Sequence, residues 1–228
     1  MKTIAVYSKP LGGIAGRTRV YPDVLGAIDK VFRREKGNSF SDFVVTHIGD
    51  RVICLLVYEE GQVNDVANIV WEAFSEGRRI AKTRKLFESQ IKISFTELKV
   101  DERETEEFVL FLAGSDNKSF WDFLPTPEDQ AAKGPSVCIC RTEGIYCTTP
   151  ELLEIFAEKE TNKKGISPVS LCDATIVRTR VTPVVALGFS LGNGILTGPL
   201  DLFDTPQFEA PRFWASECAL GKFPLWKK

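Results

Sequence analysis

The sequence has 228 residues, of which 43% are hydrophobic and 26% charged, as expected of a globular domain with a substantial buried core. Its formal net charge of -2, with both signs spread along the chain, gives no whole-chain attraction to nucleic acid or to acidic lipid. No apolar run approaches the roughly 20 residues of a membrane-spanning helix. The run from Met1 to Val6 lacks the long apolar centre of a signal peptide. We therefore expect a single cytoplasmic domain, residues 1–228, with no nucleic-acid or membrane partner.

The first half of the chain alternates strand patterns with two amphipathic helices. Apolar residues recur at helical spacing after Pro22, and Gly37 is a suitable helix end. A second, longer helix carries Lys82, Arg84 and Lys85 near its end, where they suit the negative pole of the helix dipole. In order, we expect a strand over 4–7, a Gly-rich turn over 11–16, a helix over 22–37, strands over 43–48 and 52–58, and a helix opening at Asn64 or Asp65.

Strand patterns dominate the second half. Gly192-Asn193-Gly194 lies between two apolar runs and is a strong hairpin signal. A short helix with Pro150 at its first position is expected after Thr148 or Thr149, and another is expected to start at Asp201. Strands are expected over 91–100, 108–113, 137–140, 145–147, 184–191 and 195–197, with 137–140 pairing with 145–147. Antiparallel hairpins covered by amphipathic helices predict an α+β fold.

The six cysteines favour reduced core thiols over a disulfide framework, because the chain shows no secretory signal. Cys54 lies inside an apolar run and is expected to be buried. Cys138 and Cys140 point to the same face of one strand, with Cys147 expected opposite them across a hairpin. A structural role is the favoured interpretation, and a metal or redox site is the alternative.

Common catalytic motifs are missing from the sequence. It has no GxxxxGK[ST], no GxGxxG after a strand, no HExxH and no GxSxG pattern. The single histidine, His47, lies beside a strand-to-strand turn, where a structural hydrogen bond is favoured over catalysis.

Four segments, taken in order, carry a more specific pattern. They are Val20-Tyr21-Pro22-Asp23, Thr46-His47-Ile48-Gly49-Asp50, Trp71-Glu72-Ala73-Phe74 with Ala81-Lys82, and residues 186–204. They resemble the V-H-P-[DE], T-H-x-G-D-D, W-x-x-F…A-K and G-[FY]-x-x-x-N-G-x-L-x-G-P-x-D-L-F-D motifs of the archaeal-type (class V) fructose-1,6-bisphosphate aldolase/phosphatase family. The resemblance implies a layered α-β-β-α sandwich, with antiparallel or mixed sheets flanked by helices, and a homo-oligomer.

The resemblance also implies a magnesium site, but this sequence departs from it at the ligands. Pro10 stands where a ligand aspartate is expected, and Arg17 aligns with a ligand histidine. The aspartate pair becomes Asp50-Arg51, and the A-D-K motif becomes Ala113-Gly114-Ser115. The long segment with the family's Schiff-base lysine and catalytic tyrosine, expected before Val184, is missing. Because neither proline nor arginine offers a hard oxygen ligand, we predict no magnesium cofactor and no catalytic residue; the remaining metal candidates are Asp50, Gln90 and Asp116.

Two functional hypotheses follow. The first is a non-catalytic family member that acts as a binding, regulatory or assembly protein. In its sharper form Arg17, Arg19 and Arg51, with Asp50, bind a phosphorylated small molecule without metal. The competing interpretation is that Arg17 and Arg19 lie on the surface and Arg51 pairs with an acid such as Asp50. The second hypothesis is a divergent metal-dependent sugar-phosphate phosphatase with a relocated site, built from Asp50, Gln90, Asp116 and Asp122.

Overall fold

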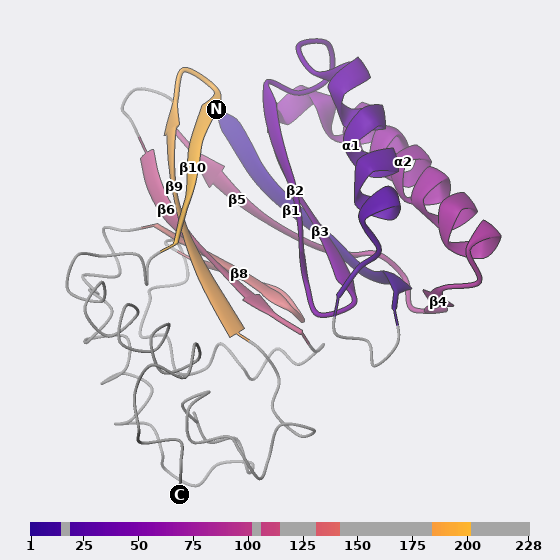
Figure 1. Ribbon diagram of the computed structural model, residues 1–228. Coiled ribbons are helices and arrows are strands. Elements are labelled where there is room, and N and C mark those ends of the chain that lie inside the picture. Colours follow the sequence, from indigo (N-terminus) through magenta and orange to yellow (C-terminus); the bar gives the residue numbers. More distant parts are fainter. Residues whose placement is uncertain (15–18, 102–105, 115–130, 142–183, 202–228) are drawn as a thin grey trace, which may run out of the picture.

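Strand β1 (Lys2–Gly13) is the centre of the first sheet, because it pairs with neighbours along both edges. The computed structural model describes residues 1–14, 19–101, 106–114, 131–141 and 184–201 (Figure 1). On one side β1 pairs with β3 (Arg51–Glu59), and β2 (Asp42–Ile48) lies outside β3. On the other side it pairs with β5 (Ser94–Val100) and, at its end, with the short β4 (Phe87–Glu88). All of these pairings are antiparallel.

Two helices cover one face of this sheet (Figure 1). Helix α1 (Pro22–Glu35) has proline at its start, and Gly37 just beyond its end has a positive φ of 87°. The 3-10 turn η2 (Glu60–Gln62) leads into α2 (Val63–Thr83). Both helices bury one apolar stripe against the sheet, as their spacing predicts. The core of this layer includes Ala5, Tyr7, Leu11, Val24, Ile28, Phe32, Leu56, Val70 and Phe74.

The second sheet lies against the other face of the first. It consists of β6 (Glu106–Ala113), β7 (Ala131–Lys133), β8 (Val137–Arg141), β9 (Val184–Gly192) and β10 (Ile195–Asp201), in the order β10-β9-β6-β8-β7. The rings of Phe108 and Phe189 stack at a centroid distance of 5.4 Å within this core. Side chains of alternate residues fill the space between the sheets, among them Ile4, Val6, Ile53, Leu55, Val57, Leu110, Leu112 and Ile139.

The α+β prediction is confirmed, and the described residues form three layers: helices, first sheet and second sheet. The expected α-β-β-α sandwich needs a further helix layer on the second sheet. The helices predicted after Thr148 and after Asp201 lie outside the described residues, apart from Asp201 itself, which ends β10. Within the described ranges, neither helix is long and apolar enough to cross a membrane.

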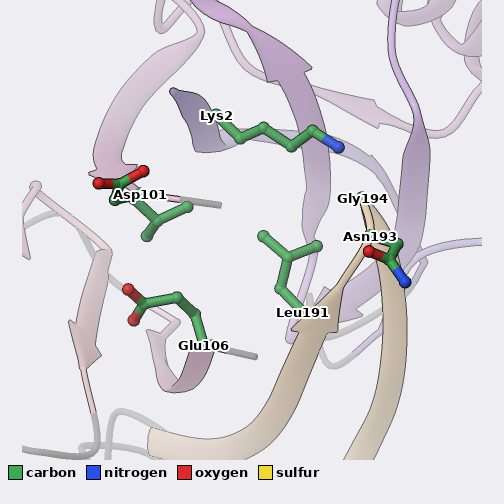
Figure 2. Close-up of a pocket in the computed structure, with 7 residues that line it drawn as sticks. Lys2, Asp101, Glu106, Leu191, Asn193 and Gly194 are labelled. Carbon is green, nitrogen blue, oxygen red and sulfur yellow. The ribbon is translucent and has the colours of Figure 1, made fainter. Parts of the chain in front are cut away.

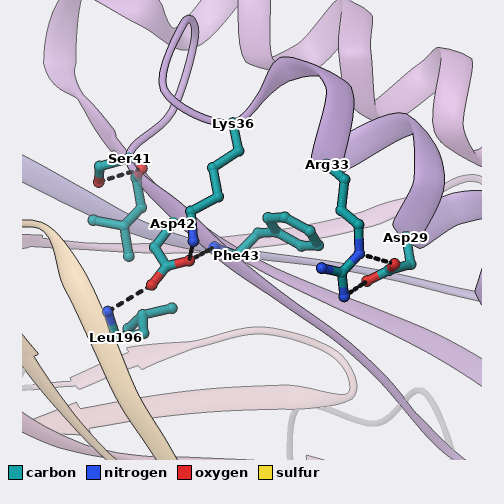
Figure 3. Close-up of polar contacts among 8 residues, drawn as sticks. Asp29, Arg33, Lys36, Ser41, Asp42, Phe43 and Leu196 are labelled. Atoms are coloured by element: carbon teal, nitrogen blue, oxygen red, sulfur yellow. Dashed lines mark hydrogen bonds and ion pairs between the residues drawn. The ribbon is translucent and has the colours of Figure 1, made fainter.

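Asp42 ties the edge of the first sheet to the edge of the second (Figure 3). One carboxylate oxygen accepts hydrogen bonds from Lys36 Nζ at 2.6 Å and from the Phe43 amide at 2.9 Å. The other accepts from the amide of Leu196, in β10, at 2.9 Å. We call Asp42 with these three donors the Asp42 bridge.

The structure differs from the sequence prediction at several places. Strand β1 runs through Gly13 instead of ending before the Gly-rich turn, with a register shift between Leu11 and Gly13. Gly12 takes a positive φ of 69°, which lets the strand bend without breaking off. Helix α2 begins at Val63 because η2 already starts the helical path. Strand β8 pairs with β6 and with the unpredicted β7, while residues 145–147 lie outside the described part of the chain.

Candidate functional site

The β2–β3 turn and the end of β1 bring together positions at which the sequence loses expected metal ligands. Pro10 and Arg51 are direct partners across the β1–β3 ladder. The amide of Leu11 donates to the carbonyl of Asp50 at 3.0 Å. Residues that lie 39 and 41 positions apart in the sequence therefore share one end of the first sheet.

Asp50 is the surviving carboxylate at this end, and it is 5% exposed. Its side chain lies against Gly13: a Cβ placed on Gly13 would be 2.8 Å from Asp50 Cβ. Only glycine leaves room for the aspartate there. The Gly-rich segment therefore leaves the space that the Asp50 side chain occupies, in addition to forming a bend in the chain.

Arg51 is also buried, at 3% exposed, and it points into the space between the two sheets. Its Nη1 donates to Ser8 Oγ at 3.4 Å. Ser8 Oγ lies 2.8 Å from the Oγ of Ser136, which precedes β8 in the second sheet. We call these residues the Arg51–Ser8–Ser136 cluster. It joins the two sheets through polar groups at the end where the apolar core stops.

The third altered position reaches the same cluster from the second sheet. The amide of Ala113 donates to the carbonyl of Ser136 at 2.8 Å, which places Gly114 beside it in the chain. The two sheets also approach closely where Gly134, between β7 and β8, faces Thr96 of β5: a Cβ on Gly134 would collide with Thr96 Oγ1. Pro10, Arg51 and Gly114 therefore gather near one end of the inter-sheet space.

The other predicted site residues are more scattered. Arg19 is exposed, and its carbonyl accepts from the Ile14 amide at 3.2 Å. Gln90 is exposed and follows β4, which pairs with the end of β1. His47 Nδ1 lies 3.2 Å from the Gly49 carbonyl, a local contact that fits the predicted structural role. Arg17, Asp116 and Asp122 lie outside the described residues.

This donor set does not fit a magnesium cluster. Mg²⁺ prefers an octahedral shell of hard oxygen ligands and is attracted by carboxylates. At the three altered positions the described chain offers a proline, a guanidinium and a glycine. Across the residues that the structure describes, no group of three or more histidine, cysteine or acidic side chains is arranged to hold a metal ion.

Sequence reasoning missed the two serines. Ser8 sits in a buried strand, on the face that also carries Ile4 and Val6, so a polar residue there was a usable signal. Nothing in the sequence around Ser136 singles it out. The contact between the two hydroxyls joins residues 128 positions apart.

The cysteines of the second sheet form a close pair of thiols. Cys138 and Cys140 are buried, with their Sγ atoms 3.2 Å apart. The hydrogen bond with Cys140 and burial raise the pKa of the Cys138 thiol, and burial raises the pKa of Cys54. Protonated, buried thiols agree with the structural interpretation. Cys147, Cys172 and Cys218 lie outside the described residues.

Comparison with known proteins agrees with the sequence motifs. Residues 2–124 and 130–221 match the family described as fructose-1,6-bisphosphatase. The fructose-1,6-bisphosphate aldolase/phosphatase of Ignicoccus hospitalis is 25% identical, over 95% of this chain and 83% of its own. That of Metallosphaera sedula is 23% identical over 94% and 84%. That of Thermus thermophilus is 30% identical, over 49% of this chain and 35% of its own.

The alignment with the Ignicoccus protein also shows how much shorter this chain is. It extends over 322 positions, and this chain has 228 residues, so at least 94 positions have no counterpart here. This agrees with the missing segment inferred from the motifs. Because the family match covers most of the sequence, the chain belongs to the fructose-1,6-bisphosphatase family.

Proposed function

We propose that this chain is a family member without magnesium-dependent aldolase or phosphatase chemistry, and that it acts as a binding, regulatory or assembly protein. The observation that carries the proposal is the buried guanidinium of Arg51, hydrogen-bonded to Ser8, beside the retained Asp50. Arginine keeps its charge at every relevant pH, so this position is permanently cationic.

The charge of Arg51 by itself opposes the binding of a divalent metal ion at this position. A divalent ion held about 5 Å from a guanidinium would be repelled by about 7 kcal/mol at an effective dielectric constant of about 20. That is comparable to the free energy of a micromolar binding reaction, about 8 kcal/mol. The single carboxylate of Asp50 offsets little of this repulsion, because tight divalent sites combine several oxygen ligands.

The narrower proposal is a phosphorylated small molecule bound through Arg17, Arg19 and Arg51. Guanidinium groups support it, since they bind phosphate oxygens in a bidentate manner without a metal. The contact of Arg51 with Ser8, away from solvent, favours instead a guanidinium that fixes the two sheets at the place of the lost ligands.

Calorimetry separates these versions. Fructose 1,6-bisphosphate is titrated into the protein with and without Mg²⁺, and into Arg51→Ala and Arg19→Ala variants. Metal-independent binding that both variants weaken supports the anion pocket. Binding that requires Mg²⁺ contradicts the proposal as a whole. Absence of binding in all three proteins rejects the anion pocket and leaves the binding or assembly role to a macromolecular partner.

A second candidate is the divergent sugar-phosphate phosphatase. The observation in its favour is that Asp50 is kept, buried and positioned against Gly13. Phosphate release from a panel of sugar phosphates is measured with Mg²⁺, Mn²⁺ or Zn²⁺. Release that disappears in Asp50→Asn supports this candidate, and an inactive panel rejects it.

A further inference from the structure

Two cysteines of strand β8 form a close pair on the outer face of the second sheet. Cys138 and Cys140 are both buried, and their Sγ atoms lie 3.2 Å apart. They alternate along the strand with Val137 and Ile139, which fill the core between the two sheets. Because side chains alternate between the two faces of a strand, the two thiols share the face that points away from the first sheet. The proposed function makes no use of either thiol.

The spacing of the pair along the strand allows a disulfide bond. Residues two positions apart in a strand have Cα atoms about 6.6 Å apart, at about 3.3 Å per residue. Cα atoms that a disulfide joins lie about 4.4–6.8 Å apart, most often about 5.5–6 Å. A bond between Cys138 and Cys140 therefore falls at the long end of the allowed range, and its formation should draw the two Cα atoms together.

We propose that Cys138 and Cys140 form an oxidation site, at which hydrogen peroxide converts the two thiols into an intrachain disulfide. In the first step one thiol attacks the peroxide, the O–O bond breaks, and the sulfur becomes a sulfenic acid as one water leaves. In the second step the other thiol attacks that sulfur and an S–S bond forms. The hydroxyl group leaves with the thiol proton as a second water, so the peroxide takes up the two electrons that the sulfurs lose.

The short distance between the sulfurs decides the product. Once one sulfur carries the hydroxyl group, the second thiol is already in contact with it, at the observed Sγ–Sγ distance of 3.2 Å. The second step is intramolecular and should therefore outrun attack by another peroxide from solution. Burial sets the rate, since the thiolate is the nucleophile and peroxide reaches it only during local opening. The pair should react slowly, and it should stop at the disulfide before sulfinic acid forms.

The disulfide should act on strand β7. Within the described chain β7 pairs with β8 alone, and Ala131 and Lys133 lie directly opposite Cys140 and Cys138. A shorter distance between the two cysteine Cα atoms does not match the spacing of these two partners. Strand β6, by contrast, pairs along the whole length of β8. We therefore expect oxidation to release β7 from the sheet edge while β6 and β8 stay paired.

Peptide mapping after peroxide treatment tests the proposal. Trypsin cleaves after Lys133 and Arg141, so both cysteines fall in the peptide 134–141, which contains no other cysteine. The folded protein is treated with hydrogen peroxide, and the remaining thiols are alkylated in urea. The peptide is expected to be lighter by two hydrogen atoms and unalkylated, and dithiothreitol should restore both thiols. Cys54, buried between the helices and the first sheet, is the internal control and is expected to stay reduced.

Single-cysteine variants provide the matched comparison. In Cys138→Ser and in Cys140→Ser the remaining sulfur has no neighbouring thiol on β8, so it should gain oxygen at the peroxide dose at which the wild type stops at the disulfide. A wild-type peptide 134–141 that keeps both thiols, or that gains oxygen, overturns the proposal. A disulfide that forms only after unfolding in urea also overturns it.

Hydrogen exchange measures the effect on the sheet. Amides of residues 131–133 should exchange faster in the oxidised protein, and unchanged exchange there rejects the effect on β7. The reference is the Leu196 amide in β10, just beyond the turn at which Asn193 and Gly194 line a small pocket with Lys2 (Figure 2). Because β6 and β9 separate β10 from β8, exchange at Leu196 should not change. The proposal does not depend on the chemistry at Arg51.

Discussion

Removal of the Asp42 carboxylate should loosen the contact between the edges of the two sheets. The Asp42 bridge joins Lys36 on the α1 side, the Phe43 amide in β2 and the Leu196 amide in β10 (Figure 3). The Lys36 side chain is 48% exposed, so its ion pair contributes at most about 1 kcal/mol. Each hydrogen bond from a backbone amide to the charged carboxylate contributes about 1.5 kcal/mol or more. We expect Asp42→Ala to lower the free energy of unfolding by about 3 kcal/mol.

Two variants separate the contributions. Asp42→Asn keeps one acceptor oxygen and should cost about 1–2 kcal/mol, whereas Lys36→Met should cost about 1 kcal/mol or less. Urea unfolding gives the free energies, and hydrogen exchange at the Leu196 amide reports the bridge directly. Faster exchange at Leu196 is expected in Asp42→Ala. A loss below about 1 kcal/mol in Asp42→Ala, with unchanged exchange, refutes this account of the bridge.

The bridge also predicts a pH dependence. Burial raises the pKa of Asp42, but the hydrogen bonds from Lys36, Leu196 and Phe43 outweigh it and hold the pKa below its ordinary value of 3.8. A carboxyl with a lowered folded-state pKa stabilises the protein fully above the unfolded-state pKa. That stabilisation is lost as the pH falls through the folded-state pKa. Asp42→Ala should therefore show a weaker loss of stability below pH 3.8 than the wild type.

Three further predictions concern the core and the site. Gly77→Ala should destabilise the protein by about 1–2 kcal/mol, because the new Cβ would lie 2.9 Å from Ile28 Cδ1. Gly26→Ala, on the open face of α1, should stabilise the protein by about 0.5–1 kcal/mol. Equal effects of the two variants in urea unfolding would contradict this packing. Because their pKa values are raised, Cys54 and Cys138 should react slowly with iodoacetamide at pH 8 in the native state and rapidly in urea, and fast native labelling contradicts their burial. Arg51→Ala should cost about 2–4 kcal/mol of unfolding free energy, with partial recovery in Arg51→Lys; unchanged stability argues against a structural role for the guanidinium.

The elements that the sequence predicted well are those whose signal is local. The helices at 22–35 and 63–83 follow from apolar spacing, since one face of each is buried on a sheet. The β9–β10 hairpin follows from its turn residues. Asn193 and Gly194 have positive φ values of 52° and 79°, as a two-residue hairpin turn requires.

The elements that it predicted poorly depend on distant partners. Strand β7 has three residues, Ala131–Lys133, and exists because β8 offers an edge on which to pair. Strand β1 continues through Gly13 because its end pairs with the distant β4. No local sequence pattern predicts β7 or the extension of β1.

The same division holds at the site. The motif resemblance indicated Pro10, Asp50, Arg51 and Gly114, and the structure brings these positions together at one end of the sheets. The resemblance could not indicate Ser8 or Ser136, because their contact depends on how two sheets pack. It also could not show that Arg51 is buried and donates a hydrogen bond to Ser8.

The central claim, that magnesium chemistry is absent from this family member, is tested most directly by phosphate release from fructose 1,6-bisphosphate with Mg²⁺. The fructose-1,6-bisphosphate aldolase/phosphatase of Ignicoccus hospitalis serves as the positive control in the same assay. We predict that this chain releases phosphate no faster than a blank without protein. Magnesium-dependent release above that blank, abolished in Asp50→Asn, would contradict the account.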